Sequence, residues 1–576
     1  MILLKLSANK ESFHPVTFNR KGLSLIVGRK HNPEVSDIKK TYNGVGKSLL
    51  INIIHFCLGS SASTEFENKI PDWEFSLEFE IDGQVYIARR NTSRQDYVYL
   101  NNDEFTLKEF KNLMLVLIFN INPPIPFLTF RPLISRFIRP RKESYVKFDL
   151  YVDKEQDFNQ LLCNAYLLGL DINRVLKKHE LRGEENKVRD LRKNIKKDEI
   201  VKQFLTDNED VSISLIDIKD RMSVLEKNLK NLKVATDYHN IQEEANKLSF
   251  EIKTLENESV ILQNAVKNID KTLEIKTDIS QEDIYKMYED AEYNISEAIK
   301  EKIDSVIEFH KKLITDRERR LNGEKKKLER KMDAVNKVRV EKGNRLDDLL
   351  KYLDTHGALE ELNSLNSQLA DLRLKFTKLS TYKNLIAEYD NKISNINIEF
   401  ETENINTIDY LNQSKTLLDQ NLSIFRNYSK QFYEDRPGGI DVVNNEGKNT
   451  LRYNIEVKIQ DDASDGINEV KMFCFDFTLL RAKHNHDMRF IFHDSRLFGN
   501  MDSRQLTTLF KVAYNDSNEK DFQYISSLNE KDLSSISSEL DSDVEFKKII
   551  LDNIVLELTD ESEATKLLGI EVDMNY

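Results

Sequence analysis

The chain has 576 residues, of which 32% are charged and 39% hydrophobic, and a mean hydropathy of -0.55; this is lean for one large globular core and favours an elongated part. Its net charge of -13 gives the whole molecule no electrostatic footprint for nucleic acid, so contact with DNA would need a local basic patch. No run approaches the roughly 18 apolar residues of a membrane span, and the apolar run from Met1 to Leu6 is too short for a signal peptide, so we expect a cytoplasmic protein with no membrane contact.

The N-terminal part reads as mixed α/β. A strand-like run at Leu23–Val27 precedes a glycine-rich loop, and the apolar segment Leu49–Phe56 after the loop has the length of one helix. Two further strand-like runs, Phe75–Ile81 and Val85–Arg89, flank Asp82-Gly83, which predicts a hairpin turn.

The glycine-rich loop predicts a phosphate site. In the pattern G-x-x-x-x-G-K-[ST], backbone N–H groups wrap the α- and β-phosphates, the lysine reaches the β- and γ-phosphates, and the hydroxyl binds Mg²⁺. Gly46, Lys47 and Ser48 fit this pattern, whereas Thr41 stands at the first glycine position. We therefore expect ATP here with Mg²⁺ on Ser48, the alternative being a chance loop. The residues expected to contact the nucleotide are Asn43, Gly44, Val45, Gly46, Lys47, Ser48 and Leu49.

A long helical region follows, because no proline occurs between Pro140 and Pro437. From about residue 180 to 430, apolar residues alternate by four and three. One such seam runs over Ile241–Leu273 and is interrupted only by Ser259; a second runs over Leu362–Phe400, with one phase slip near residue 380. This is the period of a left-handed coiled coil, and we expect the second seam to be the return helix of an antiparallel hairpin.

The tip of this hairpin is expected at Asp278–Asp283. The three cysteines, Cys57, Cys163 and Cys474, form no C-x-x-C, which argues against a disulfide framework and against a zinc hook at the tip.

Two basic stretches are candidates for DNA contact. The first, after the proline corner at Asn122–Pro126, consists of Arg131, Arg136, Arg139, Arg141 and Lys142. The second consists of Arg317, Arg319, Arg320, Lys325, Lys326, Lys327, Arg330, Lys331, Lys337, Arg339, Lys342 and Arg345. Glutamates interleave with the second stretch, so it is either the solvated face of a coiled coil or a surface that tracks DNA.

After Pro437-Gly438-Gly439 the chain returns to mixed α/β. The pattern predicts strands at Arg452–Ile459, Met488–Phe492 and Asp521–Ser526, and a buried helix at Val470–Arg481. One more helix or strand is expected within Phe546–Glu557.

Asp494 follows a buried strand, where a Walker B carboxylate would hold Mg²⁺, so Lys47 and Asp494 are the candidate catalytic residues. The next position normally holds a glutamate that polarises water, and here it is Ser495. Three interpretations stay open: slow turnover with another group such as His493, a sensor of the γ-phosphate, or an inactive binding fold. His493 can equally be a structural histidine at a strand end.

Three further residues are candidates for contact with a nucleotide across a dimer. Ser464 and Gly466 precede the helix at Val470, where a signature segment would close a partner's site, and the alternative is an ordinary helix start. Asp502 stands where a D-loop aspartate would, and it is also a candidate N-cap. In the switch position Ser527 or Asn529 would replace the usual histidine.

With these motifs and the segments Ile53–Gly59, Lys471–Phe477 and His493–Phe498, the chain resembles a bacterial branch of the SMC and double-strand-break-repair ATPases that carries a C-terminal domain of unassigned function. The resemblance implies an α/β ABC-type ATPase head assembled from N- and C-terminal halves, with a long antiparallel coiled-coil insertion. The head halves would be residues 1–180 and 431–576, and the arm residues 181–430 with its tip near 275–300.

Members of this branch look like ATPase components of defence operons against phage and plasmids, including Lamassu-type and three-component ABC systems. The resemblance implies a head-engaged homodimer that senses double-stranded foreign DNA without sequence preference. Its expected partners are an effector nuclease and a small accessory subunit. The alternatives are a DNA-repair or chromosome-structure ATPase and a nucleotide-independent coiled-coil scaffold; hydrolysis stays open and would be slow.

Overall fold

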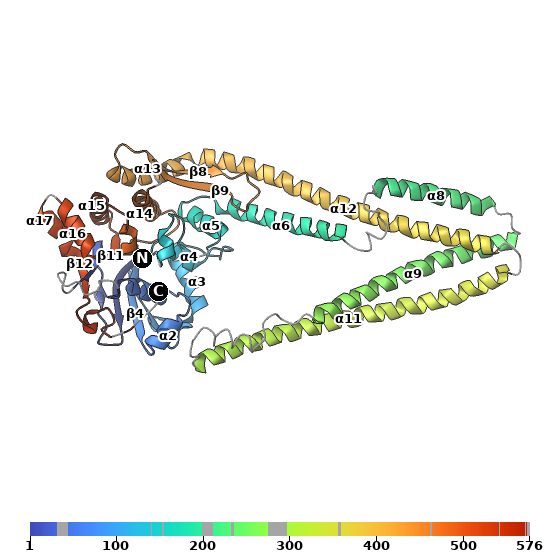
Figure 1. Cartoon of the computed structure of the whole chain (residues 1–576), viewed down its shortest axis with the longest axis horizontal. Coiled ribbons are helices and arrows are strands. Elements are labelled where there is room, and N and C mark those ends of the chain that lie inside the picture. The colour runs from blue at the N-terminus through green and yellow to red at the C-terminus, as the bar shows by residue number, and fades with distance from the viewer. Residues whose placement is uncertain are drawn as a thin grey trace. The chain divides into compact units, whose positions relative to one another are not determined.

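The computed structural model describes residues 1–30, 44–139, 141–151, 155–197, 211–231, 236–274, 297–354, 359–460, 464–540, 542–570 and 572. They form two compact units, one from residues 1–187 and 394–576 and the other from residues 188–393. In Figure 1 the first unit is a mixed α/β body with helices that extend from it, and the second consists of long helices.

The first unit contains a parallel sheet built from both ends of the chain. Its strands are β3 (Gly22–Arg29), β10 (Phe490–His493), β11 (Gln523–Asn529) and β12 (Ile554–Thr559), in the order β10-β11-β3-β12. Near-continuous burial of β3, β10 and β11 is what a parallel sheet covered on both faces requires. The early strand β3 thus lies between two strands that come more than 490 residues later.

A second, antiparallel sheet has the order β2-β1-β4-β5-β6-β7. Its strands are β1 (Ile2–Ala8), β2 (Val16–Thr17), β4 (Glu74–Ile81), β5 (Gln84–Asn91), β6 (Tyr97–Leu100) and β7 (Asp103–Thr106). The predicted hairpin turn is confirmed: Asp82 and Gly83 join β4 to β5, both with positive φ, as a type I′ turn requires. Helix α1 (Lys47–Cys57) contacts β3 of one sheet and β4 and β5 of the other, and its apolar side chains are buried there.

Helices and one hairpin complete this unit. The helices are α2 (Thr64–Lys69), α3 (Leu107–Phe119), α4 (Phe130–Ser135), α5 (Asp157–Leu167), α13 (Lys415–Phe432), α14 (Asp465–Ala482), α15 (Ser503–Glu519), α16 (Glu530–Glu539) and α17 (Asp543–Ile549), and the hairpin is β8 (Gly438–Asn444) with β9 (Tyr453–Ile459). Short 3-10 turns lie at Lys142–Tyr145 and Ser495–Phe498. The predicted strands and helix after Pro437 are confirmed, and Phe546–Glu557 holds the end of α17 and the start of β12.

The second unit is a set of long helices. It contains α8 (Val211–Asn231), α9 (Thr236–Glu274) and α11 (Glu297–Asp354), together with parts of α6 (Ile172–Lys197) and α12 (Leu359–Gln413). Helices α9 and α11 run antiparallel, since Asp270 pairs with Lys325 at 2.6 Å while Glu251 pairs with Lys342, also at 2.6 Å.

The prediction that the later seam is the antiparallel partner of the Ile241–Leu273 seam is wrong, because α11 is that partner. Among the described residues, the two seams meet where Ala245 of α9 shares a buried cluster with Leu362 and Leu369 of α12. Charged residues interrupt the apolar seam of α11, and their ion pairs with α9 compensate for the missing apolar contacts. Ser259, which interrupts the apolar seam of α9, donates a 3.2 Å hydrogen bond to Asn336 of α11.

Helix α12 pairs with α8 through Arg373–Glu226 at 2.6 Å and with α6 through Arg192–Asp390 at 2.7 Å. It also contacts α9, through an ion pair of Lys253 with Asp371 and a 3.0 Å hydrogen bond from Lys378 to Asn257. The predicted tip, Asp278–Asp283, lies outside the described residues.

Apolar side chains from four helices form the core of the second unit. Leu229 of α8, Leu349 and Leu353 of α11, and Leu362 and Leu369 of α12 are buried with Ala245 of α9. In the part of the chain that the structure describes, no helix is both long and apolar enough to cross a membrane.

Candidate functional site

The glycine-rich loop leads directly into helix α1. Gly46 is the N-cap of this helix with φ 110°, a left-handed conformation that glycine adopts at little cost, and Gly44 has φ 88°. Val45 and Leu49 are buried, so the core holds both the loop before Gly46 and the first turn of α1 after it. Asn43 and Thr41 lie outside the described residues.

The structure brings together the three residues that the sequence singles out for chemistry. Ser48 Oγ donates a 2.9 Å hydrogen bond to Asp494 Oδ2, although the two residues are 446 positions apart. Ser48 lies in the first turn of α1 and Asp494 directly follows β10, so the pair sits at the carboxyl edge of the parallel sheet. A hydroxyl and a carboxylate are hard oxygen ligands that suit Mg²⁺ when phosphate oxygens complete its shell.

Lys47 is buried beside this pair. A Cβ on Gly28, near the end of β3, would collide with the Lys47 ammonium, which places the side chain against the edge of the sheet. Burial lowers the pKa of Lys47 to about 8, and the carboxylates of Asp494 and Asp532 oppose that shift. The ammonium lies at the N-terminus of α1, where backbone N–H groups and the helix dipole favour a bound anion such as phosphate.

The surroundings of Asp494 fix its carboxylate. Oδ1 accepts a 3.1 Å hydrogen bond from the Arg496 N–H, which leaves Oδ2 directed at Ser48. Ser495 contributes no carboxylate, and its N–H donates at 2.9 Å to the buried Ser527 of β11. Asn529 ends β11, and its N–H donates to Asp532 at 2.8 Å at the start of α16. Ser527 and Asn529, the two candidates for the switch position, thus each form a hydrogen bond with a neighbouring part of the fold.

His493 is buried and bonded through both ring nitrogens. Nε2 lies 3.0 Å from Asp476 Oδ2, so it donates to that carboxylate, and Nδ1 lies 3.3 Å from the Tyr524 hydroxyl. Burial is the main cause that lowers the pKa of His493 below its ordinary value, so the ring is neutral at pH 7. These contacts match a structural histidine rather than a group that contacts substrate.

The dimer-contact candidates form a second cluster. Ser464 is the N-cap of α14, and a Cβ on Gly466 would lie 2.9 Å from the Asn500 carbonyl oxygen, so the first turn of α14 packs closely on the segment after β10. Asp502 is the N-cap of α15: its Oδ1 accepts a 2.6 Å hydrogen bond from the Gln505 N–H, and its own N–H donates to Gln505 Oε1 at 2.8 Å. The cap role of Asp502 is confirmed.

Most of the first basic stretch is not an exposed surface, which corrects the expectation that the stretch as a whole contacts DNA; only Arg141 and Lys142 are exposed. Arg136 and Arg139 are at most 1% exposed and pair with Glu155 at 2.8 Å and Asp476 at 2.6 Å. Arg131 lies 2.7 Å from the buried His55 ring. In the second stretch, Lys325, Arg339, Lys342 and Arg345 pair with carboxylates of α9, while Lys326, Lys327, Arg330, Lys331 and Lys337 are exposed.

Sequence reasoning missed several residues at the site. The Leu567 N–H donates to the Val45 carbonyl at 3.1 Å, and a Cβ on Gly46 would collide with the Leu567 side chain, so the C-terminal segment packs on the glycine-rich loop. Tyr145 and Asp532 also lie at the site, and no local pattern marks either. Asp476 lies in the Lys471–Phe477 segment, and this was the signal that could have found it.

Comparison with known proteins gives a partial match. Residues 428–572 match a family model described as an uncharacterised protein conserved in bacteria (DUF2326). No curated protein matches the chain.

Three solved structures are similar to the chain. The Smc head domain with a coiled coil and joint from Pyrococcus yayanosii is 15% identical, with 94% of each chain covered and a TM-score of 0.34. The Smc head domain with an extended coiled coil from Pyrococcus furiosus, bound to the C-terminal domain of ScpA, is 12% identical, with 94% of this chain and 92% of that chain covered and a TM-score of 0.33. A third, the SmcHead bound to the C-winged helix domain of ScpA, is 9% identical, with coverages of 93% and 92% and a TM-score of 0.34.

Proposed function

We propose that this protein is the ATP-binding, SMC-like subunit of a bacterial defence complex that senses foreign DNA and controls a partner effector nuclease. The observation that carries the nucleotide part is the 2.9 Å hydrogen bond from Ser48 to Asp494 beside the buried Lys47. In P-loop NTPases a hydroxyl and a carboxylate placed in this way share Mg²⁺, while the lysine binds the β- and γ-phosphates. Here Ser48 and Asp494 would hold Mg²⁺, and Lys47 would contact the phosphates.

A slow switch suits the residues around Asp494. Ser495 has no carboxylate to polarise water, and both ring nitrogens of His493 are engaged in the core. A nucleotide that binds one of two states more tightly shifts the population without fast hydrolysis. Two heads joined through two nucleotides, with Ser464, Gly466 and Asp502 at the contact, would form such a switch.

The defence and DNA-sensing parts rest on other observations. The Lys471–Phe477 and His493–Phe498 segments carry the resemblance to the defence-operon branch. The exposed lysines and arginine of α11 offer a surface for sequence-independent, salt-sensitive contact with the phosphates of double-stranded DNA. The effector nuclease and the accessory subunit would be separate proteins.

The test is ATP binding and turnover by the purified protein with Mg²⁺, with and without linear DNA. We expect slow turnover that responds to DNA. In Lys47→Ala and Asp494→Ala the affinity for ATP should fall by about tenfold or more, since a hydrogen bond to a charged group is worth roughly 1.5–3 kcal/mol. Lys10→Ala, which removes an exposed lysine of the same unit, is the matched control.

Two outcomes would contradict the proposal. Failure of the wild type to bind ATP under any condition would leave the scaffold alternative. Fast turnover that is independent of DNA would instead favour a repair or chromosome-structure ATPase.

A further inference from the structure

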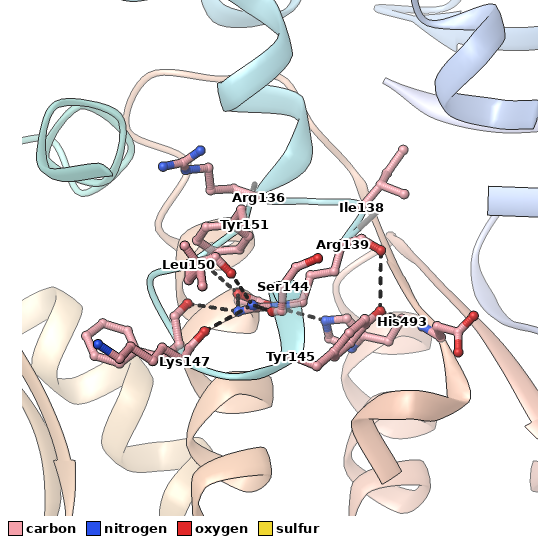
Figure 2. A network of polar contacts seen from close by, with 12 residues as sticks. Arg136, Ile138, Arg139, Ser144, Tyr145, Lys147, Leu150, Tyr151 and His493 are labelled. Carbon is pink, nitrogen blue, oxygen red and sulfur yellow. Dashed lines mark hydrogen bonds and ion pairs between the residues drawn. The ribbon is translucent and has the colours of Figure 1, made fainter. Parts of the chain in front are cut away.

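A buried group of charged and polar side chains lies behind Asp494. At its centre the Asp476 carboxylate accepts two hydrogen bonds from Arg139, at 2.6 Å from Nε and 2.8 Å from Nη2. His493 Nε2 and the Tyr151 hydroxyl donate to the same carboxylate at 3.0 and 2.7 Å. Figure 2 shows Arg139, Tyr151 and His493 close together within the curve of the loop that carries Tyr145. His493 is the residue directly before Asp494, so this group fixes one end of the segment that bears the candidate Mg²⁺ ligand.

The loop after Arg139 adds a second contact with Asp494. Arg139 also donates to carbonyl oxygens of this loop, including Phe148 at 2.8 Å and Leu150 at 3.3 Å, so the loop is wrapped around the guanidinium. From the loop, the Tyr145 hydroxyl accepts a 2.8 Å hydrogen bond from the backbone N–H of Asp494 itself. The position of Asp494 therefore depends on a loop that Arg139 and Asp476 hold in place.

Helix α14 also holds the other end of the segment. Glu469, in the second turn of α14, accepts hydrogen bonds from the Asn500 N–H at 3.0 Å and from its side-chain amide at 2.9 Å. Asp476, two turns further along the same helix, holds His493. One helix thus binds the chain on both sides of Asp494, and its N-terminus carries Ser464 and Gly466.

We propose that Asp476 and Tyr145 are positioning residues for Asp494, which hold its carboxylate in the orientation that Mg²⁺ coordination with Ser48 requires. The inference rests on the proposed function, because it assigns a role at the same nucleotide site. Mg²⁺ demands near-ideal octahedral geometry, and loss of a partner behind a metal ligand commonly weakens metal affinity by 10–100-fold. A movement of α14 at its N-terminus would reach Asp494 through these contacts.

The test measures how much Mg²⁺ the bound nucleotide requires. ATP binding is followed in EDTA and then during titration with Mg²⁺, in the wild type, Tyr145→Phe and Asp476→Asn. We expect both variants to bind ATP in EDTA as the wild type does. They should need an about tenfold higher Mg²⁺ concentration to reach the tighter ATP binding that Mg²⁺ produces. Tyr166→Phe is the matched control, because it removes a buried hydroxyl that donates to the Phe119 carbonyl away from the site.

Tyr145→Phe keeps the test decisive if Asp476→Asn does not fold, since burying Arg139 without its carboxylate is costly. An unchanged Mg²⁺ requirement in Tyr145→Phe would overturn the positioning role, and so would equal weakening with and without Mg²⁺. Absence of ATP binding in the wild type would overturn the proposed function itself and this role with it.

Discussion

Lys47 is buried where its charge is costly, and a phosphate bound at the proposed site would offset that cost. Burial lowers its pKa from 10.5 to about 8, despite the nearby carboxylates of Asp494 and Asp532. Because a lysine binds phosphate only as ammonium, we expect ATP affinity to fall above pH 8, by up to tenfold per pH unit. Binding measured at pH 7, 8 and 9 checks this.

The matched variant is Lys47→Arg, because a guanidinium stays charged over this range. Its ATP affinity should be flat between pH 7 and 9; an equal fall in both proteins would assign the effect to another group.

The same shift has the opposite effect on stability. Between pH 8 and 10.5 the unfolded chain binds more protons at Lys47 than the folded chain, so the free energy of unfolding without nucleotide rises with pH over that window. The difference between the wild type and Lys47→Met isolates this contribution, and Lys47→Met should lack it.

At the scale of elements, the residue that caps α15 is also a candidate for contact across a dimer. Asp502 caps α15 through its reciprocal hydrogen bonds with Gln505. We expect Asp502→Ala to lower the free energy of unfolding by about 1 kcal/mol, whereas Asp502→Asn, which keeps a capping oxygen, should cost little. The single tryptophan, Trp73, is buried in the same unit, so its fluorescence reports the unfolding in guanidinium.

The same pair of variants separates the cap from a role across a dimer. If Asp502 also contacts a partner's nucleotide, Asp502→Asn should fold normally and lose ATP-dependent dimerisation in sedimentation. Normal dimerisation in Asp502→Asn would limit the residue to its helix.

The sequence predicted local features of the fold well. Strand β3, helix α1 and the strand before Asp494 each follow from a short run of residues whose pattern is sufficient by itself. The pairing of Ser48 with Asp494 was also predictable, because the phosphate-binding motif implies a carboxylate partner at a strand end.

The partners of helices and buried charges were not predictable in this way. A heptad pattern shows that a helix has a seam but not which helix fills it, and the ion pairs that join α9 to α11 look in the sequence like solvated charge. Arg139 and Asp476 are 337 positions apart, and neither residue carries a local sign of the other. Long-range contacts of this kind depend on the whole fold.

At the scale of the whole molecule, a net charge of -13 restricts DNA contact to local surfaces. Helix α11 offers such a surface at Lys327, Arg330 and Lys331, which are exposed on neighbouring turns. We expect their combined replacement by alanine to weaken DNA binding and to reduce the slope of log affinity against log salt by about 3, roughly one per lost phosphate contact. Fluorescence anisotropy with linear DNA at several salt concentrations measures this slope.

The control replaces Lys10, Lys21 and Lys108, three exposed lysines of the first unit, with alanine. It changes the net charge by the same amount and should leave the slope unchanged. Equal loss in both triple variants would mean that overall charge, rather than the α11 surface, governs binding.

The placement of β3 between β11 and β12 also sets an order in time. Ser48 leaves the ribosome 446 residues ahead of Asp494, an interval of roughly 20–90 s at about 5–20 residues per second. Throughout that interval β3 has neither neighbour, and its apolar strand edge is open to other chains. The helices between residues 188 and 393 can pair as soon as they emerge, so this helical unit is complete before Asp494 can join Ser48. Synthesis interrupted after residue 393 would therefore release a chain that has long helices but lacks the proposed nucleotide site.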